Sequence, residues 1–220
     1  MGKVVTIDGP AASGKTSVSR ELAKRLGWSW VSTGAFYRGL AFAALETQAN
    51  LEDENALAAL ANQREVWAVK MDDEQTSVHF KGRNVTDLIF REDVGSVASK
   101  ISHFPKVRSA LLGAQRACSE TTEGLVAEGR DCGTVVFPTA EAKIYLTASQ
   151  ENRAERRARE QGANAEEIIG AQKQRDEQDS TRKAAPMKVP EQALVLDSTD
   201  LGFEDVVGEV EKFVRSKLSV

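Results

Sequence analysis

The segment GPAASGKT at residues 9–16 constrains the fold of this chain more than any other feature of its sequence. It matches the phosphate-binding pattern G-x-x-x-x-G-K-[ST] at every fixed position. An apolar run at residues 4–7 precedes it, and residues 15–26 follow with the periodicity of a helix that ends at Gly27. In a loop between a buried strand and a helix N-terminus, unpaired N–H groups face inward and can cradle a polyphosphate. The sequence therefore predicts a nucleoside triphosphate site.

The residues of this segment, hereafter the donor loop, have separate predicted tasks. Gly9 and Gly14 let the backbone approach the phosphates closely, and Lys15 reaches the outer phosphates. The hydroxyl of Thr16, or that of Ser17 beside it, is the candidate ligand of Mg²⁺. The predicted site for the donor nucleotide comprises Gly9, Pro10, Ala11, Ala12, Ser13, Gly14, Lys15, Thr16 and Ser17.

The composition disfavours several classes of protein. The chain has 220 residues, of which 41% are hydrophobic and 28% charged, as in a globular protein, and no apolar run is long enough to span a bilayer. A net charge of −4 disfavours general binding to nucleic acid. A first strand at residue 3 leaves no room for a signal peptide, so we expect a cytoplasmic protein. Cys118 and Cys132 lack the spacing of metal ligands and are interpreted as inert thiols.

Predicted strands and helices alternate along most of the chain. This alternation predicts an α/β fold with a parallel sheet and helices on both faces, the three-layer core of P-loop NTPases. Ligands of such sheets lie at the carboxyl ends of the strands, where Gly9 and Arg130 are expected. We expect core strands at residues 3–8, 28–31, 125–127, 143–147 and 193–196, and helices at 15–26, 35–47, 53–61, 91–102, 105–118 and 206–218.

Two stretches depart from this pattern. From about residue 63 the apolar period changes from 3.6 to 2, which predicts an antiparallel meander inserted at the edge of the core. Residues 149–183, hereafter the lid segment, predict two polar helices with little apolar surface to fix them to the core, and this is typical of a mobile lid. The alternating residues of the meander are Val66, Ala68, Lys70, Val78 and Phe80.

A phosphate-binding loop identifies the donor but leaves the acceptor open. The N-K-x-D signature of switch GTPases is absent, because residues 197–200 read DSTD, and the chain is short for a motor. A small-molecule kinase remains. Its rivals are a kinase for another small anion, such as shikimate or a sugar acid, and a regulatory or scaffold protein that hydrolyses ATP slowly.

Arginines at strand ends suggest the acceptor. Arg38 follows the second predicted strand within STGAFYR, and Arg130 follows the third. Because Arg binds phosphate bidentately, two guanidinium groups that converge there favour an anionic acceptor, although each alone could be a surface charge. An acceptor phosphate is already a nucleophile at neutral pH and needs no general base.

Two further sets of residues are candidates. Arg175, Asp179 and Arg182 are spaced i, i+4 and i+7, so they share one face of a helix, where the alternative is an ion pair on a solvated helix. Glu128 closes a buried strand as a Walker-B acid does, so it is a candidate for the outer coordination shell of Mg²⁺.

The order and spacing of several motifs resemble the bacterial-type cytidylate kinases over essentially the whole chain. The donor loop alone is shared by many nucleotide enzymes, whereas the later motifs are much more specific. They read VTIDGPAASGKTSVSRELAKRLG (5–27), STGAFYR (32–38), NVTDLIFREDVGSVASKISHFPKVR (84–108), EGRDCGTVVFP (128–138), QRDEQDSTRKAAP (174–186) and ALVLDST (193–199).

The resemblance implies transfer of the γ-phosphoryl group of ATP to CMP or dCMP, with Mg²⁺, in pyrimidine nucleotide metabolism. It also implies a monomer without nucleic-acid or membrane partners. The implied division is a core domain of residues 1–32, 103–148 and 184–220, a monophosphate-binding domain with its insert at 33–102, and a helical lid at 149–183.

By similarity, Arg38, Arg130 and Arg182 would hold the acceptor phosphate, while Arg175 and Asp179 would meet its sugar. The similarity also implies that Ser99, Arg108 and Asp131 read the base, with Thr33 beside them. A carboxylate that accepts from the amino group of cytosine would face an oxygen acceptor in uracil, so it discriminates between the two bases.

The lid arginines would close over the transferred group. Arg153 and Arg157 match the lid arginines of the family and would stabilise the charge of the phosphoryl group. The residues expected to carry catalysis are Lys15, Arg130, Arg157 and Arg182.

Three positions depart from the family pattern. Glu128 stands where Asp is frequent, which puts the outer shell of the metal in doubt. Thr33 stands where some relatives have serine and keeps the hydroxyl, so we expect a changed fit and not a lost contact. Ala12 stands where many relatives have glycine, and we expect it to stiffen the donor loop slightly without removing an N–H.

Overall fold

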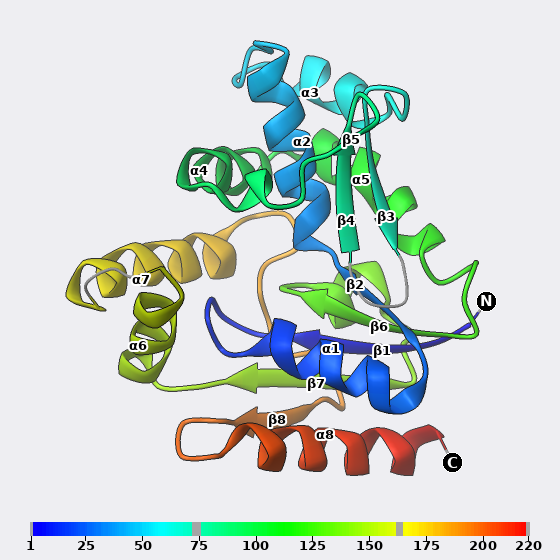
Figure 1. The fold of residues 1–220 in the computed structure, drawn as a ribbon, viewed down its shortest axis with the longest axis vertical. Helices are drawn as coiled ribbons and strands as arrows, with labels where there is room; N and C mark the ends of the chain where they lie inside the picture. Colours follow the sequence, from blue (N-terminus) through cyan, green and yellow to red (C-terminus); the bar gives the residue numbers. More distant parts are fainter. Residues whose placement is uncertain (1, 72–75, 162–164, 219–220) are drawn as a thin grey trace.

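The computed structural model describes residues 2–71, 76–161 and 165–218. Its centre is a parallel sheet in the order β2-β6-β1-β7-β8 (Figure 1). This confirms the predicted α/β core, with strand ends that differ from the predictions by a few residues. The strands are β1 (Lys3–Asp8), β2 (Ser29–Ser32), β6 (Gly124–Gly129), β7 (Ala142–Thr147) and β8 (Leu194–Asp197).

Helices cover both faces of the sheet because successive residues of a strand point to opposite faces. On β1, Val5 packs in one core cluster with residues of α1 (Lys15–Leu26) and α8 (Phe203–Leu218). Its neighbour Val4 packs in the other cluster, with residues of α2 (Gly34–Glu46) and α5 (Pro105–Ala117). The molecule therefore has the predicted three layers.

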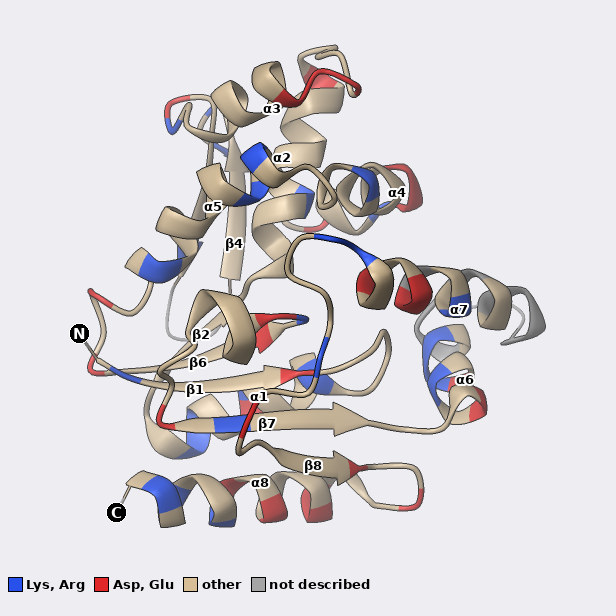
Figure 2. Ribbon diagram, turned by 180° about the vertical axis from the view of Figure 1, so that it is seen from behind, with Lys and Arg blue, Asp and Glu red and all other residues tan. Residues whose placement is uncertain are grey.

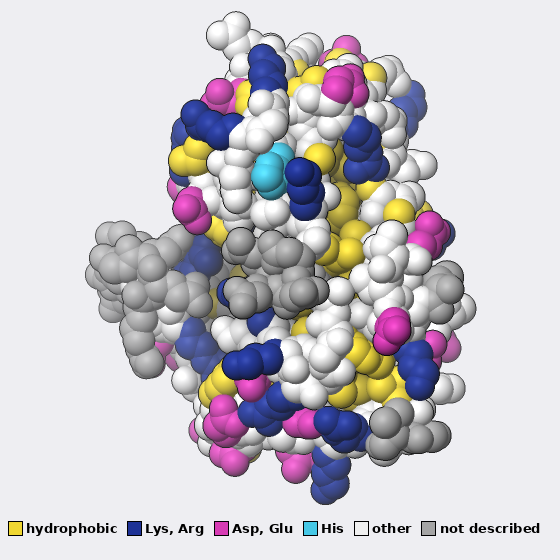
Figure 3. All heavy atoms as spheres, turned by 45° about the vertical axis from the view of Figure 1, so that its right-hand side comes forward, with side chains coloured by type: hydrophobic (Ala, Val, Ile, Leu, Met, Phe, Trp, Pro, Cys, Tyr) yellow, Lys and Arg dark blue, Asp and Glu magenta, His cyan; other side chains and the backbone are white. Residues whose placement is uncertain are grey.

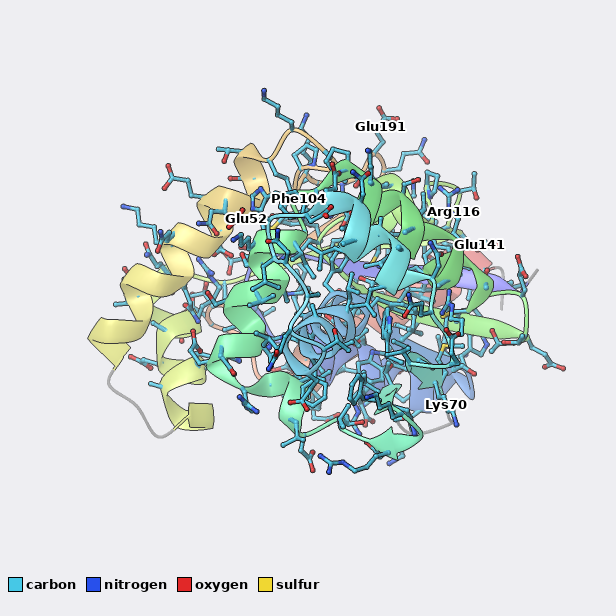
Figure 4. All side chains as sticks on the ribbon, turned by 90° about the horizontal axis from the view of Figure 1, so that it is seen from above. Glu52, Lys70, Phe104, Arg116, Glu141 and Glu191 are labelled. Atoms are coloured by element: carbon cyan, nitrogen blue, oxygen red, sulfur yellow. The ribbon has the colours of Figure 1, made fainter. Side chains whose placement is uncertain are left out.

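Helix α2 is the centre of the part of the molecule that lies above the sheet in Figure 1. It is apolar on nearly all sides, as expected for a helix surrounded by other elements. Seen from above, it lies nearly end-on among its neighbouring helices (Figure 4). These neighbours are α3 (Glu54–Ala61), α4 (Glu92–Ile101), α5 and the 3₁₀ turn at Leu88–Phe90.

The predicted meander is a second, antiparallel sheet of β3 (Trp67–Met71), β4 (Thr76–Phe80) and β5 (Arg83–Asn84). The predicted hairpin is confirmed by the antiparallel pairing of β3 with β4, although Val66, Ala68 and Lys70 do not form its buried face. Trp67 is the buried residue, because its indole packs against α2 and its Nε1 donates to the carbonyl oxygen of Leu60 at 2.9 Å. The largest apolar side chain thus sets the phase of the strand.

The lid segment forms the two expected helices, α6 (Gln150–Gln161) and α7 (Ala165–Thr181), beside the carboxyl ends of the core strands (Figure 1). Figure 2 shows basic positions on α6 and acidic positions on α7, and Arg153 of α6 forms an ion pair with Asp176 of α7. In the part of the chain that the structure describes, no helix combines the length and the apolarity needed to cross a bilayer.

The pairing of β1 with β6 positions the candidate site. Asp8 lies opposite Gly129 in the parallel register, so the donor loop and Arg130 leave the sheet next to each other. The expectation that both lie at carboxyl ends of strands is confirmed.

Gly39 is where the second sheet touches α2. A Cβ there would lie 2.9 Å from Cζ3 of Trp67 and 3.0 Å from Cγ1 of Val78. We predict that Gly39→Ala lowers the free energy of unfolding by ~1–3 kcal/mol through overpacking. Gly113→Ala in α5 is the control, because its Cβ would meet nothing within 4 Å, and it should stabilise the fold by ~0.5–1 kcal/mol. Urea unfolding of both variants tests this, and equal effects would contradict it.

Candidate functional site

The donor loop has the backbone conformation that an anion-binding loop requires. Gly9 has φ +149° and lies so close to β7 that a Cβ would sit 2.0 Å from the carbonyl oxygen of Leu146. Ala12 has φ +56°, in the left-handed region that glycine adopts more readily. Ala12, which is predicted to stiffen the donor loop, therefore occupies a strained position of the loop.

Lys15 is buried inside the loop. Its Nζ donates to the carbonyl oxygen of Pro10 at 2.6 Å and to Oγ of Ser13 at 3.4 Å. The pKa of Lys15 is lowered to about 7, mainly by burial and then by Arg130, while three nearby carboxylates oppose the shift. An anion bound in the loop would favour the charged ammonium form.

Glu128, near the end of β6, accepts hydrogen bonds from two hydroxyl groups. Its Oε1 accepts from Oγ of Ser32 at 2.5 Å and from Oγ1 of Thr16 at 3.3 Å. Ser17 is exposed on the same first turn of α1. Within residues 2–71, 76–161 and 165–218, no group of three or more His, Cys, Asp or Glu side chains could hold a metal. A hydroxyl beside a carboxylate fits Mg²⁺ only with further oxygen ligands, such as those of a bound polyphosphate.

Next to the donor loop lies a chain of paired charges that we call the acceptor cluster. It consists of Arg108, Arg130, Asp131, Asp179 and Arg182. Asp131 accepts from Arg108 and, at 3.2 Å, from Arg182. Asp179 accepts from Nε of Arg130 at 2.8 Å and from Nη1 of Arg182 at 3.5 Å.

Arg130 links the acceptor cluster to the donor loop. Its Nη1 donates to the carbonyl oxygen of Gly9 at 2.7 Å. Burial, followed by the neighbouring Arg108, lowers the pKa of Arg182. The acceptor cluster holds three guanidinium groups against two carboxylates, so positive charge is concentrated here. On the surface shown in Figure 3, by contrast, Lys and Arg are interspersed with Asp and Glu. The concentration inside the site suits a small anion.

Asp8, at the end of β1, was not among the predicted site residues. It is fully buried, and its Oδ1 and Oδ2 accept from the backbone N–H groups of Cys132 at 2.8 Å and Gly133 at 2.7 Å. Burial is the main cause that raises the pKa of Asp8 to about 6, against the effect of both hydrogen bonds. The sequence feature that could have identified Asp8 as a site residue is a carboxylate at the end of an apolar strand.

Thr33 lies where β2 passes into α2. Its Oγ1 donates to the carbonyl oxygen of Glu128 at 2.9 Å and lies 3.3 Å from Sγ of Cys132. Gln115 Nε2 donates to its carbonyl oxygen at 3.3 Å. Helix α2 therefore begins without a side-chain cap, because the Thr33 hydroxyl donates to the backbone of β6 instead.

Arg38 and Ser99 lie on the side of α2 and α4. Arg38 Nη1 donates to the carbonyl oxygen of Ile89 at 2.8 Å, and its guanidinium lies 5.6 Å from the ring centroid of Phe90. Ser99 Oγ donates to Oε1 of Gln178 on α7 at 3.2 Å. Ser99 therefore links α4 to the lid segment.

Two arginines of α6 contact the donor loop. Arg153 pairs with Asp176 and donates to the carbonyl oxygen of Ala11 at 3.0 Å. Arg156, which the predicted site did not include, donates to the carbonyl oxygen of Ser13 at 3.5 Å. The arginine-rich sequence of this helix was the available signal for Arg156.

Two predicted residues of the lid segment remain. Arg157 is half-buried on α6. The backbone of Arg175 belongs to α7, and its side chain lies outside the described part of the structure.

Known proteins resemble this chain in sequence and in fold. The family model "Cytidylate kinase" matches residues 5–216. A cytidylate kinase of Bdellovibrio bacteriovorus is 66% identical over 218 residues, covering 99% of this chain and 100% of that protein. One of Colwellia psychrerythraea is 45% identical, covering 98% and 97%. The crystal structure of a gluconokinase from Sinorhizobium meliloti covers 98% of this chain and 92% of its own, with a TM-score of 0.51 at 13% identity, so this likeness concerns the fold alone.

The buried carboxylate of Asp8 predicts a pH dependence of stability. Its folded pKa of about 6 lies above the ordinary value of 3.8, so its stabilising contribution is complete below pH 3.8 and is lost as the pH rises through 6. The total loss is ~3 kcal/mol. Relative to Asp8→Asn, the wild-type free energy of unfolding should therefore fall between pH 4 and pH 7. Urea unfolding at several pH values measures this, and parallel profiles for the two proteins would contradict it.

Proposed function

The chain belongs to the cytidylate kinase family, and we propose that it transfers the γ-phosphoryl group of ATP to CMP or dCMP, giving ADP and CDP or dCDP. One observation carries this proposal. Arg130 donates both to the carbonyl oxygen of Gly9 in the donor loop and to Asp179 in the acceptor cluster. Two anion sites that share one guanidinium suit transfer between two phosphates.

The donor would bind through the donor loop. Its backbone N–H groups and Lys15 would hold the phosphates of ATP, as expected for a loop at the N-terminus of a helix. Mg²⁺, bound with the donor, would be held by the hydroxyl of Thr16 or Ser17, with Glu128 in its outer shell, and would neutralise charge on the phosphates. The 3.3 Å contact between Thr16 and Glu128 supports this assignment.

The acceptor phosphate would be held by Arg38, Arg130 and Arg182. A phosphate monoester is already nucleophilic, so catalysis would consist of positioning and charge stabilisation without a covalent intermediate. Lys15 and Arg157 would stabilise the charge of the transferred group. Closure of the lid segment would exclude water and thereby suppress hydrolysis of ATP.

The base would be recognised by Asp131 and Arg108, with Ser99 and Thr33 beside them. An ionised carboxylate has about four lone-pair sites, so Asp131 can accept from the cytosine amino group in addition to its two arginines. Asp179 and Arg175 would meet the sugar.

This proposal includes the division of the chain into three parts, a monomeric state and a cytoplasmic location. The parts are the core domain (1–32, 103–148 and 184–220), the monophosphate-binding domain (33–102) and the lid segment (149–183). The small antiparallel sheet and α2–α4 would form the monophosphate-binding part. The polar composition of α6 and α7 supports their assignment as the lid.

Arg130→Met should lower kcat by ~10²–10³-fold, because the variant loses the guanidinium that spans both anion sites. Steady-state kinetics with ATP and CMP measure this, and thermal unfolding verifies that the variant is folded. Arg215→Met is the control, since Arg215 forms an ion pair with Glu211 on α8, away from the site. Kinetics of Arg130→Met that equal those of the control would remove Arg130 from the reaction.

Asp131→Ala should narrow the preference for CMP over UMP by ~10–100-fold in kcat/KM, because the acceptor for the cytosine amino group is lost. ADP formation with CMP, dCMP, UMP and AMP in parallel gives the wild-type profile and the change. Asp131→Asn keeps a polar partner for Arg108 and Arg182, so it serves as a second variant if the alanine variant does not fold. A wild type inactive with CMP would refute the proposed function, and an unchanged ratio would show that the base is read elsewhere.

A further inference from the structure

Ala11 in the donor loop is bound through both of its backbone polar groups by side chains of the lid segment. Its N–H donates to Oδ1 of Asp176 on α7 at 2.9 Å. Its carbonyl oxygen accepts from Nη1 of Arg153 on α6 at 3.0 Å. The same Nη1 pairs with Oδ2 of Asp176 at 2.5 Å, which closes a ring of polar contacts around this peptide.

The ring is held from both helices of the lid segment and from the sheet. Arg153 Nε donates to the carbonyl oxygen of Ala148, directly after β7, at 3.2 Å, and Gln172 on α7 donates to the carbonyl oxygen of Arg153 at 3.3 Å. The side chains of Arg153 and Asp176 are only 11% and 15% exposed. A charged pair in this environment is weakly screened by solvent, and loss of one partner leaves the other buried without compensation.

The residue after Ala11 requires such support. Ala12 has φ +56°, a conformation that residues with a Cβ adopt only at a cost in free energy. A strained residue persists when its surroundings determine its conformation, and an anion-binding loop keeps its N–H groups inward only while it keeps its shape. The fixed Ala11 peptide lies where it can supply this constraint.

We propose that Asp176 and Arg153 form a clamp on the Ala11 peptide that holds the donor loop in its phosphate-binding shape. Asp176 is a positioning residue. In this proposal Arg153 acts through Asp176 and Ala11, and not on the transferred phosphoryl group as the resemblance implies. The clamp also joins the lid segment to the donor loop, so the position of α6 and α7 affects the affinity for the donor nucleotide.

A cavity of about 440 Å³ beside the clamp supplies a matched control. Both Asp176 and Glu177 line it, so they share the same local surroundings on α7. Glu177 is exposed, whereas Asp176 is half-buried and accepts from the loop. Glu177→Ala therefore removes a carboxylate from the same surface without touching the donor loop.

The test compares Asp176→Ala, Arg153→Met, the double variant and Glu177→Ala. Calorimetric titration of each with ATP in the absence of an acceptor measures donor affinity, and steady-state kinetics measure KM for both substrates. Asp176→Ala and Arg153→Met should each weaken ATP binding ~10-fold and leave the acceptor KM within about twofold. The double variant should be no worse than either single variant, because both act through one contact.

A conservative variant separates positioning from general stability. Asp176→Asn keeps an oxygen that can accept from the Ala11 N–H, so it should recover part of the ATP affinity lost in Asp176→Ala. Glu177→Ala should bind ATP like the wild type, and thermal unfolding of all variants verifies that they are folded. If the alanine variant does not fold, the double variant, which leaves no unpaired Arg153, takes its place.

Three outcomes would overturn the clamp. Tighter ATP binding in Asp176→Ala would mean that the carboxylate competes with phosphate, and unchanged binding would mean that the loop needs no support. If the losses of ATP affinity in the two single variants add up in the double variant, and kcat falls only in Arg153→Met, then Arg153 acts on the phosphoryl group itself. The clamp rests on the proposed function only for the identity of the donor, because the binding of ATP is measured without an acceptor. A wild type that binds ATP but does not phosphorylate CMP would refute only the proposed function.

Discussion

The parallel pairing of β1 with β6 is the contact on which the rest of the site depends. Its register sets Asp8 opposite Gly129, so two segments that are far apart in the sequence leave the sheet side by side. Asp8 strengthens this arrangement, because it accepts two backbone N–H groups from the segment that follows Asp131. Phosphoryl transfer between two anions requires mainly that both be held in line and that their charge be neutralised. The sheet therefore supplies the positioning, and the side chains at its carboxyl edge supply the charge.

The charges of the acceptor cluster are paired with one another. Within the acceptor cluster, the guanidinium groups of Arg108, Arg130 and Arg182 alternate with the carboxylates of Asp131 and Asp179. Three positive groups against two negative ones leave a surplus that an anionic ligand can satisfy. The lid segment is attached to this region largely through polar contacts. Such contacts can be exchanged for those of a ligand more readily than a packed apolar interface can, which suits a segment that must open and close.

The positions at which this chain departs from the family pattern have identifiable roles. The side chain of Glu128 is one methylene longer than that of Asp and contacts Ser32 and Thr16 together. Thr33 keeps the hydroxyl and uses it on the backbone of β6. Ala12 occupies a left-handed conformation beside a peptide that lid residues hold on both sides. Each departure is accommodated by a contact from another part of the chain.

The sequence by itself determined the features that depend on short-range pattern: the donor loop, the end of α1 at Gly27 and the order of strands and helices. Only the tertiary structure decided the phase of β3, the use of the Thr33 hydroxyl and the contacts of Asp8. It also brought Asp176 to an N–H group 165 residues away. Local pattern specifies backbone conformation through steric and hydrogen-bond preferences of neighbouring residues. The partner of a polar side chain depends on which distant backbone groups the folded chain brings within about 3 Å of it.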